Sequence, residues 1–174
     1  MTVRFSVGFC SDLHLGSRTA ARLRLFDSVE KHDAYIVSTL MMQCTKRSLL
    51  WILGDVASTE ESLHLLHAIP GRKRLIIGNH DDLGFKTYLK YFDEVHGFMR
   101  YKQCWLSHCP IHPQEMIRVS LNIHGHIHRG GITPPLPLPY LNVNWDFWSR
   151  ALSLEEVIEI RDRYNAFSGG VTYD

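Results

Sequence analysis

The sequence lacks the features of a membrane-spanning or exported protein. No stretch approaches the roughly 18 uninterrupted apolar residues that a membrane span requires. The amino-terminal run from Met1 to Phe9 is too short and too charged for a signal peptide, and it leads directly into a polar loop. We therefore expect a cytoplasmic protein that has no membrane partner.

The chain also has few cysteines and almost no net charge. The chain has 4 cysteines, no Cys-x-x-Cys pair and no spacing typical of a disulfide framework, which favours free thiols in a reducing compartment. Lysine and arginine number 19 against 18 aspartates and glutamates, which gives a net charge of +1. Binding to nucleic acid through bulk electrostatic attraction therefore has no support.

Neither an internal repeat nor a linker divides the chain. A length of 174 residues and an apolar content of 45% are ordinary for one soluble globular domain. We therefore expect residues 1–174 to form a single domain.

Apolar runs alternate with helical patterns along the chain, which predicts a layered α/β fold. Strands are expected at residues 3–9, 48–53, 74–77, 98–101, 103–107, 120–123 and 140–143. Capping-box sequences predict helices that begin at Ser58 and Ser153 and run to Ile69 and toward Arg163. Further helices are expected near residues 32–44 and 85–91. The late part of the chain indicates mixed strand directions.

Residues with metal-binding side chains follow most of these strands. Each loop carries Asp, Asn or His, and the seven candidate ligands are Asp12, His14, Asp55, Asn79, His108, His126 and His128. Loops at the strand ends of an open α/β sheet converge on ligands from distant sequence positions. Oxygen and imidazole donors together suit Mn, Fe, Zn or Co better than Ca. The pattern therefore predicts a centre that holds two metal ions.

Each motif also has a purely structural interpretation when it is taken alone. Gly54-Asp55 is typical of a turn, residues 78–81 fit a tight turn, and His126-x-His128 fits a solvated strand edge. Chance is a poor explanation for a series of such pieces, each at the end of a predicted strand. The set therefore favours a metal centre over a series of turns.

A known superfamily carries similar motifs in the same order. The series that resembles the calcineurin-like metallophosphoesterase superfamily, and especially its compact single-domain bacterial and phage members, is Asp12-x-His14, Gly54-Asp55, Gly78-Asn79-His80-Asp81, His108 and Gly125-His126-x-His128. The match spans residues 12–128, and residues 142–146 resemble the Asn-Val strand that often follows. The resemblance implies a four-layer α/β/β/α sandwich of two mixed sheets flanked by helices, with the site on top of the sheets.

The resemblance also implies a role for each candidate residue. One metal ion would take Asp12, His14 and His128, the other would take Asn79, His108 and His126, and Asp55 would bridge them. His80 would not be a ligand; it would lie beside the substrate phosphate, where we expect it to protonate or hydrogen-bond the leaving group. Manganese is the expected metal, with Fe, Zn, Ni or Co as alternatives.

We therefore expect a dinuclear metal-dependent phosphoesterase. The water shared by the two cations would attack a phosphodiester or phosphomonoester bond of a small phosphoester or nucleotide-type substrate. In the Ser/Thr protein phosphatase branch, the Gly-Asp motif continues into a further Asp and an Arg, whereas here Asp55 is followed by Val-Ala-Ser at residues 56–58. This departure argues against a protein phosphatase. It also leaves the partner that orients His80 open, with Asp81 and Asp82 as candidates.

Two alternative functions use the same fold. A scaffold that binds a protein partner should have lost ligands or the catalytic histidine, yet all seven candidate ligands and His80 are present. A nuclease would use a basic tract or an aromatic stacking platform, and neither is evident in the sequence. Both alternatives therefore rank below hydrolysis of a small phosphoester.

Substrate contacts are expected from residues in or beside the ligand loops, namely Asn79, Arg18, His112 and Arg129. For the two arginines, a solvated surface position is an equal alternative. Four further histidines lie outside every motif and are interpreted as ordinary surface or helix residues: His32, His64, His67 and His96.

Overall fold

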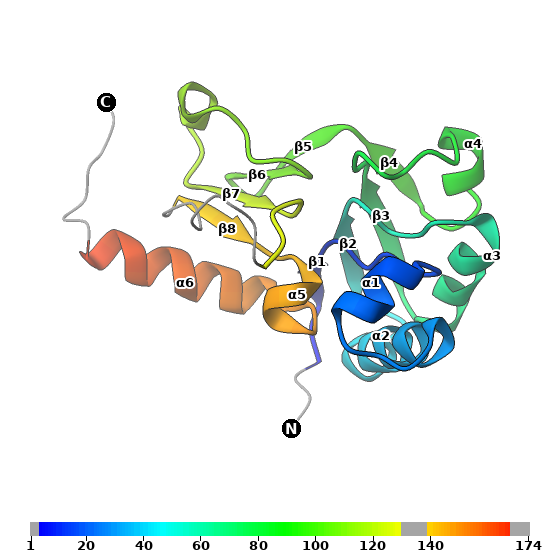
Figure 1. Cartoon of the computed structure of the whole chain (residues 1–174). Helices are drawn as coiled ribbons and strands as arrows, with labels where there is room; N and C mark the ends of the chain where they lie inside the picture. Colours follow the sequence, from blue (N-terminus) through cyan, green and yellow to red (C-terminus); the bar gives the residue numbers. More distant parts are fainter. Residues whose placement is uncertain (1–3, 130–138, 168–174) are drawn as a thin grey trace.

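The computed structural model of the protein describes residues 4–129 and 139–167. Its centre is a pair of mixed β-sheets flanked by helices, as the sequence predicts (Figure 1). The first sheet has the strand order β4-β3-β2-β1-β9. Its strands are β1 (Val7–Cys10), β2 (Leu49–Leu53), β3 (Arg72–Ile76), β4 (Glu94–His96) and β9 (Leu152–Ser153).

The second sheet has the order β5-β6-β7-β8. Its strands are β5 (Phe98–Tyr101), β6 (Cys104–Ser107), β7 (Leu121–His124) and β8 (Tyr140–Asn142). Strands β1 to β4 run parallel, as do β6 to β8, whereas β9 is antiparallel to β1 and β5 is antiparallel to β6. Because parallel strands end on the same edge of a sheet, the loops that follow them can meet there.

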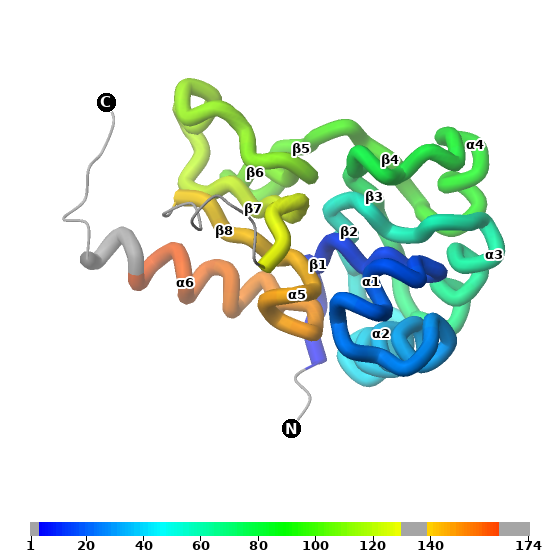
Figure 2. Tube along the Cα trace, in the orientation of Figure 1, coloured from blue at the N-terminus to red at the C-terminus, as the bar shows by residue number. Residues whose placement is uncertain are grey.

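Helices lie on both flanks of the sheets. They are α1 (Arg18–Leu23), α2 (Val29–Gln43), α3 (Glu60–Leu63), α4 (Phe85–Tyr88), α5 (Trp145–Trp148) and α6 (Leu154–Phe167), with 3-10 helices at His64–Ala68 and Pro113–Met116. In Figures 1 and 2, α1 and α2 lie together on one side of the molecule, and α6 extends away from them. No helix in the described part of the chain is both long and apolar enough to cross a membrane.

Strand β2 shows how the first sheet divides the apolar core. All of its residues are buried. Leu50 and Ile52 pack with Leu40 of α2 on the helix side, whereas Trp51 and Leu53 pack toward the second sheet. A strand that is buried on both faces is a continuous apolar run in the sequence, which is why β2 shows no apolar–polar alternation.

The predicted strands all have counterparts, although β1 begins only at Val7 and residues 1–3 of the chain lie outside the described residues. The predicted helix at residues 85–91 is shorter than expected, because α4 ends at Tyr88. The four cysteines are free, as expected.

The predicted start of α3 is wrong by one residue. Thr59, not Ser58, caps the helix, because the Thr59 side chain accepts a hydrogen bond from the Ser62 N–H at 3.2 Å. Ser58 instead donates its N–H to the Leu15 carbonyl and belongs to the loop before the helix. The α-helical part ends at Leu63 and continues as a 3-10 helix, so the expected single helix is two short ones.

The second capping box forms as predicted. The Glu156 N–H donates to Ser153 Oγ at 3.1 Å, and the Ser153 N–H donates to Glu156 Oε2 at 2.8 Å. Arg150 donates to both oxygens of the same carboxylate, at 2.9 and 2.6 Å. Helix α6 therefore begins with two of its free amides satisfied.

Candidate metal centre

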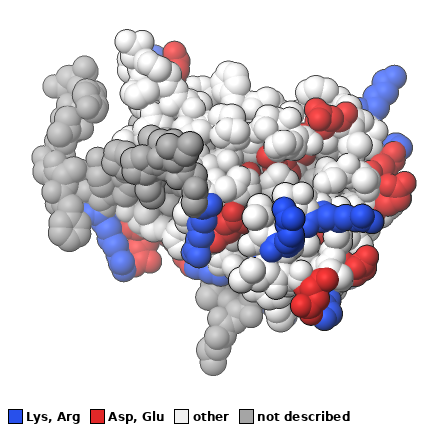
Figure 3. Space-filling model, in the orientation of Figure 1, with Lys and Arg blue, Asp and Glu red and all other residues white. Residues whose placement is uncertain are grey.

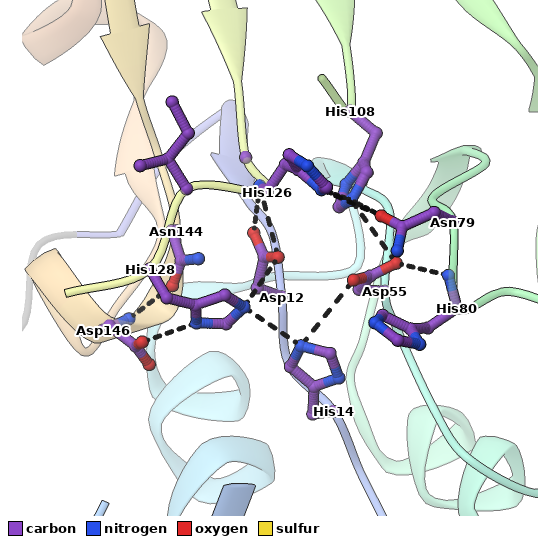
Figure 4. Close-up of polar contacts among 12 residues, drawn as sticks. Asp12, His14, Asp55, Asn79, His80, His108, His126, His128, Asn144 and Asp146 are labelled. Carbon is purple, nitrogen blue, oxygen red and sulfur yellow. Dashed lines mark hydrogen bonds and ion pairs between the residues drawn. The ribbon is translucent and has the colours of Figure 1, made fainter. Parts of the chain in front are cut away.

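Polar loops from both sheets meet at one edge of the molecule, and Figure 4 shows the side chains that they bring together. The first sheet contributes residues that follow β1, β2 and β3, and the second contributes residues that follow β6 and β7. These residues are Asp12, His14, Asp55, Asn79, His80, His108, His126 and His128. The structure thus gathers the seven predicted ligands and His80 in one place.

The first group of donors consists of Asp12, His14 and His128. Their ligand atoms all lie within 4.8 Å of one another. His128 Nε2 is 3.5 Å from Asp12 Oδ1 and 3.4 Å from His14 Nε2. One carboxylate and two imidazoles at these distances could hold one cation, and such a mixed donor set favours transition metals.

The second group consists of Asn79, His108 and His126. Asn79 Oδ1 lies 2.9 Å from both His108 Nε2 and His126 Nδ1, and the two nitrogens are 3.2 Å apart. His108 Nδ1 donates to the Leu53 carbonyl at 2.8 Å, which directs Nε2 toward the centre. This group could hold a second cation.

Asp55 lies between the two groups and is almost completely buried, with 2% of its surface exposed. Its Oδ1 is 3.4 Å from His108 Nε2 in one group, and its Oδ2 is 3.7 Å from His14 Nε2 in the other. Each carboxylate oxygen therefore faces a different donor group. This is the placement expected of a ligand that bridges two ions.

The protonation states of Asp55 and His14 favour cation binding. Burial alone would raise the pKa of Asp55, but hydrogen bonds from the His108 side chain and the His80 N–H lower it to about 2. Burial lowers the pKa of His14 to about 4. Near neutral pH, Asp55 is therefore ionised and His14 is neutral, and these are the forms that bind metal.

Two other histidines hold protons more tightly. Burial lowers the pKa of His108, but a hydrogen bond to Asp55 and the charge of Asp12 raise it overall. A hydrogen bond to Asp146 is the largest cause that raises the pKa of His128. Asp12, a predicted ligand, contributes to raising both pKa values, whereas Asp146 is not a predicted ligand.

Three glycines leave the space that the ligands occupy. A Cβ atom at Gly78 would overlap with Asp55 Oδ1, and one at Gly125 would overlap with Asp12 Oδ2. A Cβ atom at Gly54 would overlap with the His108 ring. The close packing and the mixed oxygen and nitrogen donors together fit a pair of divalent cations.

Four of the predicted ligands have a left-handed backbone. The φ angles are 57° at Asp12, 50° at His14, 55° at Asp55 and 68° at His126. Such conformations cost residues other than glycine on the order of 1–3 kcal/mol each, and they cluster at functional sites. Backbone hydrogen bonds between the loops that follow β1 and β2 stabilise these conformations at Asp12, His14 and Asp55. One of them runs from the Asp12 N–H to the Gly54 carbonyl at 2.9 Å.

Arg24 connects the first donor group to its surroundings. Its guanidinium donates to the Asp12 and Leu13 carbonyls at 2.7 and 2.9 Å, and to Asp146 Oδ1 at 2.8 Å. Asp146 Oδ2 in turn accepts a hydrogen bond from His128 Nδ1 at 2.6 Å. Arg24 and Asp146 therefore fix both the loop that carries Asp12 and the ring of His128. Neither residue is a candidate ligand or substrate contact by its sequence pattern alone.

His32 lies on helix α2, which is one of the two positions predicted for it, but it is fully buried and not at the surface. Its Nε2 lies 2.9 Å from Arg24 Nη1, so it also supports the centre. Its Nδ1 lies 2.7 Å from Asp33 Oδ1, and Asp33 Oδ2 accepts the Gly16 N–H at 2.9 Å. The network around the centre therefore extends into α2.

Asp81 has a different role from the one considered for it. Its carboxylate accepts the backbone N–H groups of Gly78, Asp55 and Val56 at 2.8 to 2.9 Å, so it joins the loops after β2 and β3. The exposed His80 ring lies 5.8 Å from the His14 ring, centroid to centroid. Within the described residues, the His80 imidazole donates no hydrogen bond to Asp81 or Asp82 that would orient it.

Two of the four residues predicted to contact substrate lie at the donor groups or in the groove beside them, and two do not. Asn79 belongs to the second donor group, and Arg129 lines an open groove that also reaches three histidines of the centre. Arg18 is the first residue of α1, and His112 caps a 3-10 helix. Neither makes a hydrogen bond or ion pair with the donor groups in the described part of the chain, and their role in substrate binding stays a prediction.

Comparisons with known proteins agree with these observations. The sequence profile of the calcineurin-like phosphoesterase family matches residues 5–163. The Gene 66 protein of Mycobacterium phage L5 is 31% identical over 192 aligned positions, which cover 87% of this chain and 92% of that protein. The Gene 66 protein of Mycobacterium phage D29 is 41% identical over 81 positions, 44% of this chain and 40% of that protein. A crystal structure of a protein of unknown function from Aquifex aeolicus is 28% identical and has a TM-score of 0.68, with 88% of this chain and 98% of that chain covered.

Proposed function

Because the chain belongs to the calcineurin-like phosphoesterase family, we propose that it is a dinuclear metal-dependent hydrolase of phosphodiesters. The observation that carries the proposal is the position of Asp55, whose two carboxylate oxygens face two separate donor groups. Asp12, His14 and His128 would hold one divalent ion with Asp55, and Asn79, His108 and His126 would hold the other. We propose Mn²⁺ as the ion, since the donors are mixed nitrogen and oxygen.

The metals and the chain would contribute differently to the reaction. When bound, two divalent ions polarise the phosphoryl oxygens and lower the pKa of a water molecule toward neutrality. The chain holds the ligands in rigid loops, because Asp81 and Arg24 join the loops through backbone carbonyl and N–H groups. His80 stands beside His14 with an exposed ring and is the group proposed to protonate the leaving oxygen. Such a step typically contributes a factor of about 10²–10⁴ in rate.

A diester is favoured over a monoester by the charges near the centre. The groove beside the donor groups is lined by two arginines, Arg24 and Arg129. Arg24 is paired with Asp146 at 2.8 Å and therefore offers little charge to a substrate. A diester phosphate carries one negative charge where a monoester carries up to two, so it depends less on such cations. The second ester group of a diester also needs space, which the groove provides.

The proposal is tested by a hydrolysis assay of metal-free protein resupplied with Mn, Ni, Co, Mg or Zn. The substrates are an aryl monoester, an aryl diester, cyclic nucleotides and single-stranded DNA. We expect Mn-stimulated cleavage of the diester. Asp55→Asn and His80→Ala should each lower the rate at least about a hundredfold, the first by loss of the metal bridge and the second by loss of the acid. His64→Ala, which changes a histidine outside the centre, should keep the full rate.

The same assay separates the alternatives. A scaffold that binds a protein partner would hydrolyse none of the substrates with any metal. A nuclease would cleave single-stranded DNA in preference to the small diester. Full activity in the Asp55→Asn protein would show that the proposed bridging role is wrong.

A further inference from the structure

A groove of about 960 Å³ adjoins the candidate metal centre. Its walls include three histidines of the centre, namely His14, His80 and His128, together with residues of α1, α2 and α5. Pockets for small molecules typically measure about 300–1,000 Å³, so the groove has the size of a small-molecule site. A molecule bound by phosphate at the centre would extend directly into it.

One wall of the groove is formed by α1, α2 and the turn between them, and it exposes several large apolar side chains. Leu23 is 73% exposed, Leu25 is 91% exposed and Tyr35 is 44% exposed. The Phe26 and Tyr35 rings lie with their centroids 5.5 Å apart at 45°, which gives the wall an aromatic section. Adjacent exposed apolar side chains of this kind mark binding sites more often than scattered ones do.

The turn that carries this wall is strained. Leu25 has a φ of 61°, a left-handed conformation that is rare for a residue with a branched side chain. The turn is held by backbone hydrogen bonds from Leu25 N–H to the Arg22 carbonyl at 3.1 Å and from Phe26 N–H to the Ala21 carbonyl at 2.9 Å. A strained turn that keeps apolar side chains at the surface, next to a candidate centre, is consistent with a role in binding.

Two polar side chains of the groove are engaged within the protein. Ser17 Oγ accepts the Ala20 N–H and caps α1, and Arg24 is paired with Asp146. Arg129 lies over the Phe147 ring at 5.5 Å, and it has no carboxylate partner among the residues that the structure describes. Figure 3 shows basic side chains over α1 and uncharged surface beside them. The groove therefore offers flat apolar surface with a cation at its rim.

We infer that the groove binds an aromatic ester group of the substrate while the attached phosphate lies at the metal centre. This inference rests on the proposed function, and it adds the chemical class of the substrate. Because His14, His80 and His128 also line the groove, a group attached to a phosphate at the centre would extend into it. The exposed leucines and the Phe26–Tyr35 pair favour a flat apolar group, which gains from leaving water and from stacking.

The test is a calorimetric comparison of two phosphonates that bind to the Mn²⁺-loaded protein. Methylphosphonate carries only the metal-binding head, and 1-naphthylmethylphosphonate adds a flat aromatic group. We expect the naphthyl compound to bind at least about tenfold more tightly, because it buries apolar surface. Leu23→Ala and Tyr35→Ala should each remove a large part of this preference and leave the affinity for methylphosphonate unchanged. Both side chains are exposed, so these variants should fold normally.

Met42→Ala is the matched control. Met42 lies on α2 like Tyr35 and is 53% exposed, but it does not line the groove. Its replacement should leave both affinities unchanged. Equal affinities of the two phosphonates for the unmodified protein would overturn the inference while the metal centre stands. Failure of both phosphonates to bind would overturn the inference together with the proposed function.

Discussion

Asp55 shows how one buried side chain can serve two donor groups. Its carboxylate accepts the His80 N–H at 2.9 Å, and its own N–H donates to Asp81 at 2.9 Å. The left-handed backbone at Asp55 and Gly54 turns the chain sharply at the end of β2. Hydrogen bonds therefore fix both the backbone and the side chain before any cation arrives, which reduces the entropy lost on binding.

Gly125→Ala should weaken metal binding without unfolding the protein. The added methyl group would overlap with Asp12 Oδ2 and with Ser11 Oγ, so the Asp12 carboxylate must move away from the first donor group. We expect a loss of about 10–100-fold in Mn²⁺ affinity, the range seen when the supports of metal ligands are disturbed. Calorimetric titration with Mn²⁺ measures it.

Gly97→Ala provides the control for this substitution. An added Cβ atom at Gly97 meets no atom within 4 Å, so the same chemical change is made in open space. Its Mn²⁺ affinity should equal that of the unmodified protein. Normal affinity in Gly125→Ala would mean that Asp12 tolerates displacement and is not a tightly held ligand.

Arg24→Met should lower both stability and metal affinity. The change removes the donor to the Asp12 carbonyl and to Asp146 Oδ1, and it removes one of the two polar partners of the buried His32, at a cost of about 2–3 kcal/mol in the free energy of unfolding. Because Asp146 also orients His128, the Mn²⁺ affinity should fall about tenfold or more. Urea denaturation and calorimetry measure the two effects.

Arg22→Met tests whether charge alone explains these losses. Arg22 lies on the exposed side of α1 and makes no ion pair within the described residues. Its replacement removes the same charge from the same region and should change neither quantity by more than about 0.5 kcal/mol. Equal losses in the two variants would contradict the supporting role of Arg24.

The residues found from the sequence differ in kind from those that were missed. The predicted ligands each carry a donor atom and follow a strand, so position in the sequence reveals them. Arg24, His32 and Asp33 act through neighbours that only the tertiary structure supplies. Asp146 could have been identified from the sequence, because it is the acidic residue at the end of residues 142–146, a run that resembles the superfamily's Asn-Val strand.

The helices and strands that the sequence did not predict are all short. Strand β2, which was predicted, is a continuous apolar run, whereas β9 has two residues and exists through its pairing with β1. Helix α1 has six residues and exposes Leu23, so it shows no apolar face in the sequence. Strand β4 has three residues and helix α5 has four, and neither is long enough to show a period in the sequence.

Ser153→Ala and Glu156→Gln should each destabilise the protein by about 1 kcal/mol at pH 7, because each breaks one arm of the capping box of α6. The hydrogen bond from Arg150 is the largest cause that lowers the pKa of Glu156. A lowered folded pKa stabilises the protein above the unfolded pKa, and this contribution is lost as the pH falls through the folded value. The loss in the free energy of unfolding caused by Glu156→Gln should therefore become smaller as the pH falls below about 4.5.

Urea denaturation at a series of pH values from 7 down to about 3 measures this dependence, with Glu155→Gln as the control. Glu155 lies in the same first turn of α6 and is exposed, but it takes no part in the capping box. Its replacement removes one charge near the helix start and should cost only about 0.3 kcal/mol. A loss in Glu156→Gln that is constant with pH would contradict the role given to its carboxylate.

At the scale of the whole molecule, the centre exists because the two sheets meet at their ligand-bearing edge. The Ser11 N–H donates to the Val143 carbonyl, and the Trp145 N–H donates to the Ser11 carbonyl, so the chain after β8 runs beside the end of β1. This contact brings the loops of the first sheet against those of the second. The strand-end motifs predicted convergent loops, and the family resemblance implied two mixed sheets. The contact that joins the sheets depends on backbone atoms, which no motif records.

The central claim is that these loops hold two cations rather than one. A crystal of the Mn²⁺-loaded protein, measured with anomalous scattering at the manganese edge, tests it most directly. We predict two peaks, one between Asp12, His14 and His128 and the other between Asn79, His108 and His126, with the Asp55 carboxylate in contact with both. A single peak, or peaks outside these two donor groups, would contradict the account.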